Sequence, residues 1–121
     1  MVPSVTKPHG INSNTFASVN LVKDTPTTLV TDSGPIVVRK IVASGSGLMK
    51  VDVQWGTTGG ETTKIVGFNS TSNPNVDIAF VDGADISGTE TIKVVCTNLE
   101  NSASPASDFA GYVTIFGHKK T

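Results

Sequence analysis

The sequence predicts an all-β protein: a single antiparallel β-sandwich of about eight strands, jelly-roll or immunoglobulin-like, behind an extended N-terminal arm. Short segments rich in Val, Ile and Thr recur along most of the chain and are separated by clusters of Gly, Pro, Asn, Asp and Ser. No segment keeps a helical period for more than one turn. A chain of 121 residues is long enough for one domain with its own core.

Residues 1–17 are expected to form the arm, because they lack hydrophobic periodicity and contain Pro3, Pro8 and Gly10. Apolar side chains are spaced along this segment at Val2, Val5, Ile11 and Phe16. The spacing favours an arm that packs on a neighbouring molecule; the alternative is a terminus without fixed contacts. Residues 18–121 are then the β-sandwich domain.

Eight segments of that domain are expected to be strands. They are 18–23, 27–31, 35–44, 48–55, 61–69, 76–80, 90–97 and 109–117. Asp24-Thr25-Pro26 forms the turn between the first two, because proline presets the backbone angle there. The third segment is nearly continuous in Val and Ile, which predicts a central strand buried on both faces. Arg39 and Lys40 interrupt it, and the pattern does not say which of them points outward.

The fourth segment alternates most clearly. Met49, Val51, Val53 and Trp55 fall on one face, which predicts a half-buried strand with Trp55 in the core. The short glycine-rich loop 56–60 joins it to the next segment and therefore predicts an antiparallel hairpin.

The last three segments each have one apolar face. Val76, Ile78 and Phe80 precede Asp82-Gly83-Ala84-Asp85, which is expected to be a solvated turn. Cys96 shares a face with the apolar residues of its segment and is expected to be buried.

In the final segment the apolar residues Val113 and Ile115 alternate with Tyr112, Thr114 and Phe116. Two sheets built from about eight such strands fit a jelly roll and an immunoglobulin-like sandwich equally well, and the spacing does not separate the two topologies.

The charge balance argues against nucleic acid and membrane partners. Nine Lys and Arg oppose ten Asp and Glu, so the formal net charge is −1. No apolar run reaches the length of a membrane span, and the first residues contain no apolar signal region. We therefore expect a chain made in a cytoplasm and not exported by the usual secretory route.

The residue types that usually serve in catalysis or metal binding do not form a recognisable motif in the sequence. Cys96 has no base near it in sequence, and His9 and His118 lie towards the two ends of the chain. Asp52 lies on a polar strand face, and we expect it to be solvated or paired with Lys64 on the neighbouring strand. The acidic residues of 82–85 are too few for a calcium loop. We expect no catalytic residue, no metal, no cofactor and no enzyme activity.

Three stretches resemble the small virion proteins of tailed bacteriophages. They are residues 38–51 (VRKIVASGSGLMKV), residues 67–75 (GFNSTSNPN) and residues 110–117 (AGYVTIFG). The resemblance covers about residues 18–117 and implies a decoration (cement) protein, in which a β-sandwich lies on the capsid exterior and has no active site. It further implies binding to the lattice of the major capsid protein, often as a homo-oligomer (trimer), and a location in the virion. The arm is then the candidate contact with the capsid or a sister subunit.

The alternative function is a carbohydrate- or receptor-binding β-sandwich module of a phage tail or fibre. Trp55 and Tyr112, exposed and close together on one sheet face, would favour that alternative. A third possibility is an immunoglobulin-like adhesion domain, since one fold serves several functions.

Overall fold

The computed structural model describes residues 14–100 and 108–120, and within them it contains eight β-strands and no helix. Val2, Val5 and Ile11 lie outside the described residues. The strands are β1 (Thr15–Leu21), β2 (Thr27–Ser33), β3 (Ile36–Gly45), β4 (Met49–Thr57), β5 (Thr62–Phe68), β6 (Asn75–Ile86), β7 (Glu90–Asn98) and β8 (Phe109–Lys119).

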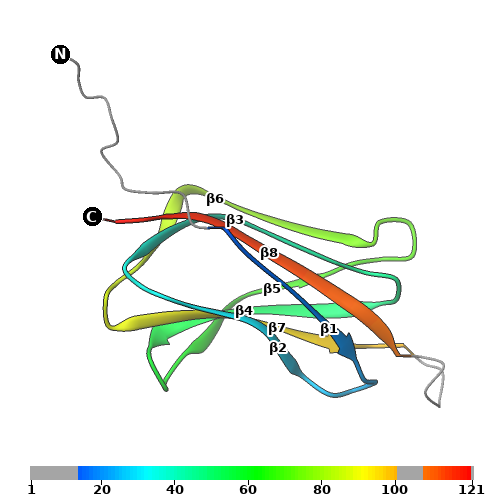
Figure 1. Cartoon of the computed structure of the whole chain (residues 1–121). Coiled ribbons are helices and arrows are strands. Elements are labelled where there is room, and N and C mark those ends of the chain that lie inside the picture. Colours follow the sequence, from blue (N-terminus) through cyan, green and yellow to red (C-terminus); the bar gives the residue numbers. More distant parts are fainter. Residues whose placement is uncertain (1–13, 101–107, 121) are drawn as a thin grey trace.

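The strands form two four-stranded sheets with antiparallel neighbours (Figure 1). One sheet, here the β8 sheet, has the order β1-β8-β3-β6. The other, here the β7 sheet, has the order β2-β7-β4-β5. The chain changes sheets at most connections, and the β4–β5 hairpin stays within the β7 sheet, as the short loop predicts.

One hydrophobic core lies between the sheets and takes side chains from both. The large side chains that are almost completely buried are Leu21, Val38, Ile41, Met49, Val51, Val53, Ile86, Ile92, Val94, Asn98, Val113 and Ile115. Burial of one such aliphatic side chain is worth about 1.5–3 kcal/mol relative to leaving it exposed. The alternation expected for β4 and β8 is confirmed at Met49, Val51, Val53, Val113 and Ile115.

Strand β1 begins earlier than the sequence pattern indicates. It starts at Thr15, which is paired with Ile115 of β8, and ends at Leu21 rather than at residue 23. Asp24 follows with a positive φ of 59° and turns the chain towards β2. Phe16 therefore belongs to the β8 sheet.

Strand β3 is an inner strand, but the expectation that it is buried on both faces is wrong. Its core-facing residues are buried, whereas the opposite face is half-buried or exposed. The register shifts between Val38 and Lys40 against both neighbouring strands. This β-bulge turns Arg39 and Lys40 to the outside together, since the extra residue breaks the alternation.

The stretch Asp82-Gly83-Ala84-Asp85 is part of β6 and not the expected turn. Ala84 pairs with Val38 of β3, and Asp85 pairs with Val37. Gly83 has a φ of 80°, and it lies within the register shift of β6 against β3. Glycine and aspartate are ordinary turn residues, but here they accommodate an irregularity inside a long strand.

Candidate interaction surface

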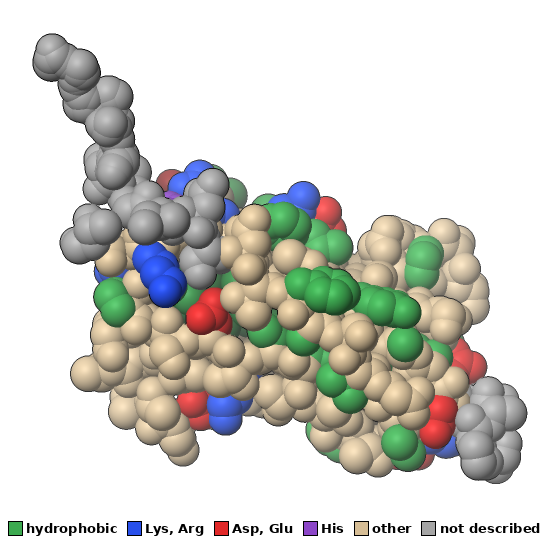
Figure 2. Space-filling view, in the orientation of Figure 1, with side chains coloured by type: hydrophobic (Ala, Val, Ile, Leu, Met, Phe, Trp, Pro, Cys, Tyr) green, Lys and Arg blue, Asp and Glu red, His purple; other side chains and the backbone are tan. Residues whose placement is uncertain are grey.

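The outward face of the β8 sheet carries a group of exposed aromatic side chains. The β1–β8 register places Phe16 opposite Thr114, between Tyr112 and Phe116 of β8. All three rings are exposed, and Phe16 is 64% exposed. We call Phe16, Tyr112 and Phe116 the aromatic patch. Figure 2 shows hydrophobic side chains gathered across the middle of this face.

Two rings of the patch stack on each other. The ring centroids of Phe16 and Tyr112 are 6.3 Å apart, and the ring planes differ by 21°. Such a pair is worth about 0.5–1.5 kcal/mol beyond its buried area. The contact fixes two large apolar surfaces side by side while leaving both open to a partner.

The neighbours of the patch on β1 and within β8 are polar and uncharged, whereas Lys40 of β3 pairs with Phe116 at one end of the patch. Ser18 and Asn20 continue the outward row of β1, and Thr114 lies between the two aromatic residues of β8. Charged side chains lie mainly towards the margin of this face in Figure 2. At one margin the Lys40 Nζ atom lies 3.6 Å from Asp77 Oδ2. An uncharged centre with charges at the rim is typical of protein interfaces.

Trp55 is not part of this surface. It lies on β4 in the β7 sheet, is half-buried, and packs against the core, where its ring meets Phe80 edge-to-face at 5.9 Å. Tyr112 lies on the other sheet, so the two rings do not form a joint exposed platform. Phe16 is the aromatic partner of Tyr112.

The residues considered for catalysis are held in structural contacts. Cys96 is buried in the core, and its burial, with a smaller contribution from the Asp52 charge, raises the pKa of the thiol to about 12. Asp52 accepts a hydrogen bond from the Thr63 hydroxyl at 3.2 Å and lies 3.6 Å from the Lys50 Nζ atom. The cross-strand partner of Asp52 is therefore Thr63 of β5 and not the expected Lys64.

The acidic residues of β6 do not converge on one point. Asp85 forms an ion pair with Lys120. Within residues 14–100 and 108–120, no group of three or more His, Cys, Asp or Glu side chains is placed to hold a metal ion. No helix in the described part of the chain could span a membrane.

Phe16, predicted as a contact residue of the arm, lies on β1 within the aromatic patch, and its contact with a partner stays a prediction. The alternation in the last strand put Tyr112 and Phe116 on the face opposite Val113 and Ile115. The meeting of Phe16 with Tyr112 depends on the β1–β8 register, which pairs the two ends of the described chain and has no local sequence signal.

No family model matches the sequence, and no curated protein matches it. The fold is similar to that of a chain in the cyanophage Pam1 capsid asymmetric unit, with a TM-score of 0.62 at 10% identity over 98% of this chain and 92% of that chain. It is also similar to the crystal structure of PirA, with a TM-score of 0.51 at 15% identity over 95% of this chain and 100% of that one. At these identities the likeness is one of fold, and this chain shares its all-β fold with a chain of a phage capsid.

Proposed function

We propose that this chain is a non-enzymatic structural protein of a phage virion, which binds the exterior of the assembled capsid and stabilises the shell. The observation that carries the proposal is the exposed aromatic patch on the outward face of the β8 sheet, which suits docking on another protein. The fold likeness to a cyanophage capsid chain supports a virion role.

We further infer that the two sheets form a jelly roll rather than an immunoglobulin-like sandwich. The strand orders β1-β8-β3-β6 and β2-β7-β4-β5 support this, because the chain passes repeatedly between the sheets as two Greek keys require. The topology puts the first and last strands side by side, with β1 at the edge of the binding face and β8 next to it.

The N-terminal arm is proposed as a second contact with the capsid or a sister subunit. Its apolar residues Val2, Val5 and Ile11 precede β1, and Phe16 of β1 already belongs to the aromatic patch. The arm would thus extend the docking surface. Deletion of residues 2–13 should weaken capsid binding or oligomerisation, and unchanged binding and oligomeric state would contradict this role.

Shell stabilisation follows from mass action. A ligand that binds the assembled lattice but not its free subunits stabilises each site by about 2.7 kcal/mol at one hundred times its Kd. A homotrimer would add avidity, since the first contact raises the effective concentration of the other two. Modest affinity at each site is then sufficient to stabilise the shell.

The test is binding to capsids that lack the chain, measured by co-sedimentation. Phe16→Ser combined with Tyr112→Ser should reduce binding at least tenfold, because both anchors of the patch are lost. Phe68→Ser is the matched control: Phe68 is 63% exposed, close to the 64% of Phe16, but lies on β5 of the other sheet. Equal binding by the double variant and the control would contradict the proposed docking face.

The second candidate is a carbohydrate- or receptor-binding module of a tail or fibre. The exposed stack of Phe16 on Tyr112 favours it, since sugar rings pack on aromatic faces and the neighbouring Ser18 and Asn20 offer hydrogen bonds. A screen of neutral oligosaccharides with the wild-type chain and the Phe16→Ser variant tests it. Binding that depends on Phe16, together with no capsid binding, would replace the first proposal.

A further inference from the structure

The irregular register of β3 creates a second feature on the outward face of the β8 sheet. Val38 pairs with Gly117 of β8, and Lys40 pairs with Phe116, so Arg39 is one extra residue relative to β8. On the other side, Val38 pairs with Ala84 of β6 and Lys40 with Ala79. Four residues of β6, 80–83, therefore lie opposite Arg39 alone, and β6 has to depart from β3 there.

A cleft of about 290 Å³ lies at this irregularity, lined by Val37, Arg39, Asp82 and His118. His118 pairs with Val37 across the β3–β8 ladder and lies two residues beyond Phe116, on the same outward face. The cleft therefore continues the aromatic patch along β8.

The backbone holds the walls of this cleft close together. A Cβ atom added to Gly83 would lie 2.5 Å from Val37 Cγ1, and the φ of 80° at Gly83 is rarely adopted by other residues. Asp82 is adjacent to Gly83 and is thus carried next to Val37. The cleft therefore results from the register shift between β3 and β6.

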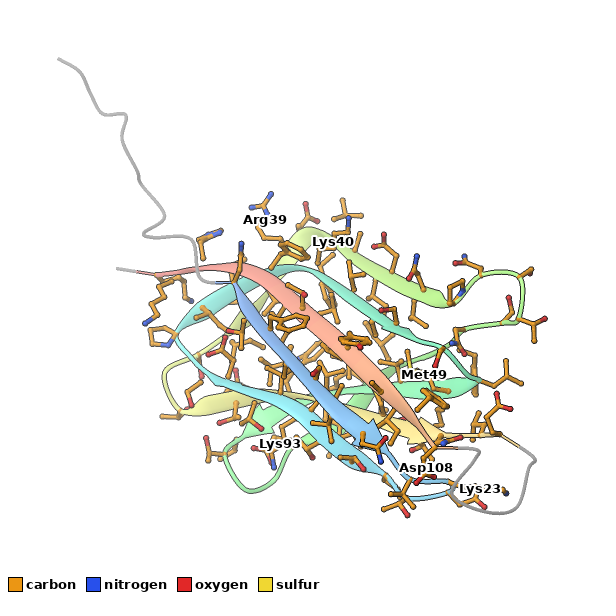
Figure 3. The ribbon with its side chains drawn as sticks, turned by 45° about the vertical axis from the view of Figure 1, so that its right-hand side comes forward. Lys23, Arg39, Lys40, Met49, Lys93 and Asp108 are labelled. Carbon is orange, nitrogen blue, oxygen red and sulfur yellow. The ribbon has the colours of Figure 1, made fainter. Side chains whose placement is uncertain are left out.

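Some of the charged side chains around the cleft have an ion-pair partner and others do not. Lys40 is close to Asp77, and Lys120 pairs with Asp85. Arg39 is exposed and, among the residues that the structure describes, takes part in no ion pair or hydrogen bond. Figure 3 shows Arg39 and Lys40 on the outside of the ribbon. The Arg39 guanidinium is thus available to an external anion.

We propose that this cleft binds the carboxylate side chain of an acidic residue on the capsid protein that covers the aromatic patch. The inference rests on the proposed function and specifies its partner. A guanidinium matches a carboxylate through two parallel hydrogen bonds, and arginine beside exposed aromatic rings is a common anchor of protein interfaces. Val37 offers an apolar wall to the methylene groups of the incoming side chain.

The chemistry of the walls favours a carboxylate over a phosphate. Asp82 puts a negative charge in the same cleft, and its repulsion of a phosphate dianion is about twice its repulsion of a single carboxylate. The overall charge of the chain is near neutral, which disfavours a nucleic-acid backbone as the occupant. A protein side chain is therefore the occupant that the charges fit.

The first test uses the full chain without capsids. N-acetylglutamate methylamide is titrated into the protein while the side-chain NMR signals of Arg39 and His118 are followed. Saturable shifts are expected with this probe, and none with its uncharged isostere N-acetylglutamine methylamide. Arg39→Gln should abolish the shift at His118, whereas Lys64→Gln, which removes one exposed positive charge from β5 on the other sheet, should leave it intact.

Other outcomes of that titration would overturn the proposal. Equal shifts with the acid and the amide would show that charge is not recognised. Stronger binding of inorganic phosphate would assign the cleft to phosphate chemistry. If Arg39 instead serves to pair with Asp82 in solution, Asp82→Asn should lower the thermal stability as much as Arg39→Gln does. In our account Asp82→Asn tightens binding of the carboxylate probe.

The second test is capsid binding by the same variants. Arg39→Gln should reduce affinity about tenfold and weaken its dependence on salt, whereas Lys64→Gln should do neither. If the double variant of the aromatic patch loses binding while Arg39→Gln does not, the docking face stands and the carboxylate site is wrong. If the wild-type chain does not bind capsids, the proposed function is wrong, and the probe titration still decides whether the cleft recognises a carboxylate. Loss of self-association in Arg39→Gln would make a second copy of this chain the partner.

Discussion

Asn98 should be one of the most sensitive single positions in the fold. It is 0% exposed at the end of β7, where its Nδ2 donates to the Leu21 carbonyl at 2.9 Å and its Oδ1 accepts from the Glu100 backbone N–H at 2.8 Å. Leu21 ends β1 in the other sheet, so this side chain joins the two sheets across the edge of the core.

Asn98→Ala leaves both of those backbone groups without their partner. The unsatisfied buried Leu21 carbonyl costs about 1–3 kcal/mol, and loss of the part-buried hydrogen bond of Glu100 adds about 0.5–1.5 kcal/mol, so the total is about 1.5–4.5 kcal/mol. A domain of this size has a total stability of about 5–15 kcal/mol, so the loss is a large fraction of it. Urea unfolding should show a lower midpoint with an unchanged slope. Asn20→Ala, an exposed change on β1, should stay within about 0.5 kcal/mol of wild type.

Asn98→Asp separates hydrogen bonding from packing, since the two side chains have nearly the same shape. The carboxylate still accepts from Glu100 but places an acceptor against the Leu21 carbonyl. Burial raises the pKa of such a carboxyl, and its protonated form can donate again. The variant should therefore regain stability relative to wild type as the pH falls. If Asn98→Ala were as stable as the wild type at neutral pH, the reasoning would be refuted.

Two further predictions concern single residues. The buried Cys96 thiol, with its pKa raised to about 12, should not react with thiol reagents at pH 8 until the chain unfolds. Because the unfolded thiol ionises at its lower ordinary pKa, wild-type stability should fall from about pH 9 towards pH 12 more steeply than that of Cys96→Ala; parallel curves would contradict this. Gly83→Ala should destabilise the fold by about 1–3 kcal/mol in urea unfolding, because φ is 80° and the new Cβ would lie 2.5 Å from Val37 Cγ1; no change would mean that the register irregularity relaxes freely.

The sequence was informative wherever one strand face is buried. Period-two alternation identified β4 through Met49, Val51 and Val53, because a pleated strand with one wet face has no other way to arrange those residues. The short loop 56–60 likewise led to the correct hairpin. These signals depend only on neighbouring residues, and the strand and hairpin that they predict are present in the structure.

The signals failed where the backbone departs from regular pleating. A bulge adds one residue to a strand and reverses the alternation, so the outward direction of both Arg39 and Lys40 was not readable. Gly83 has the appearance of a turn residue because turns and strand irregularities both use a positive φ.

The candidate surface was only half predictable for a different reason. Alternation gave the outward direction of Tyr112 and Phe116, but Phe16 reaches them through pairing between strands at opposite ends of the described chain. The sequence contains no local information on that register. The cleft proposed to bind a carboxylate depends on other long-range pairings, those of β3 with β6 and β8, since Val37, Asp82 and His118 come from these three strands.

The most direct test of the proposed function is a count of this chain in purified virus particles from its source culture. Quantitative mass spectrometry would compare its copies with those of the major capsid protein. A protein that covers the capsid lattice should be present in numbers proportional to the major capsid protein, because every equivalent lattice site offers the same surface. A small fixed number per particle would favour a tail or fibre module, and absence from particles would contradict a virion role altogether.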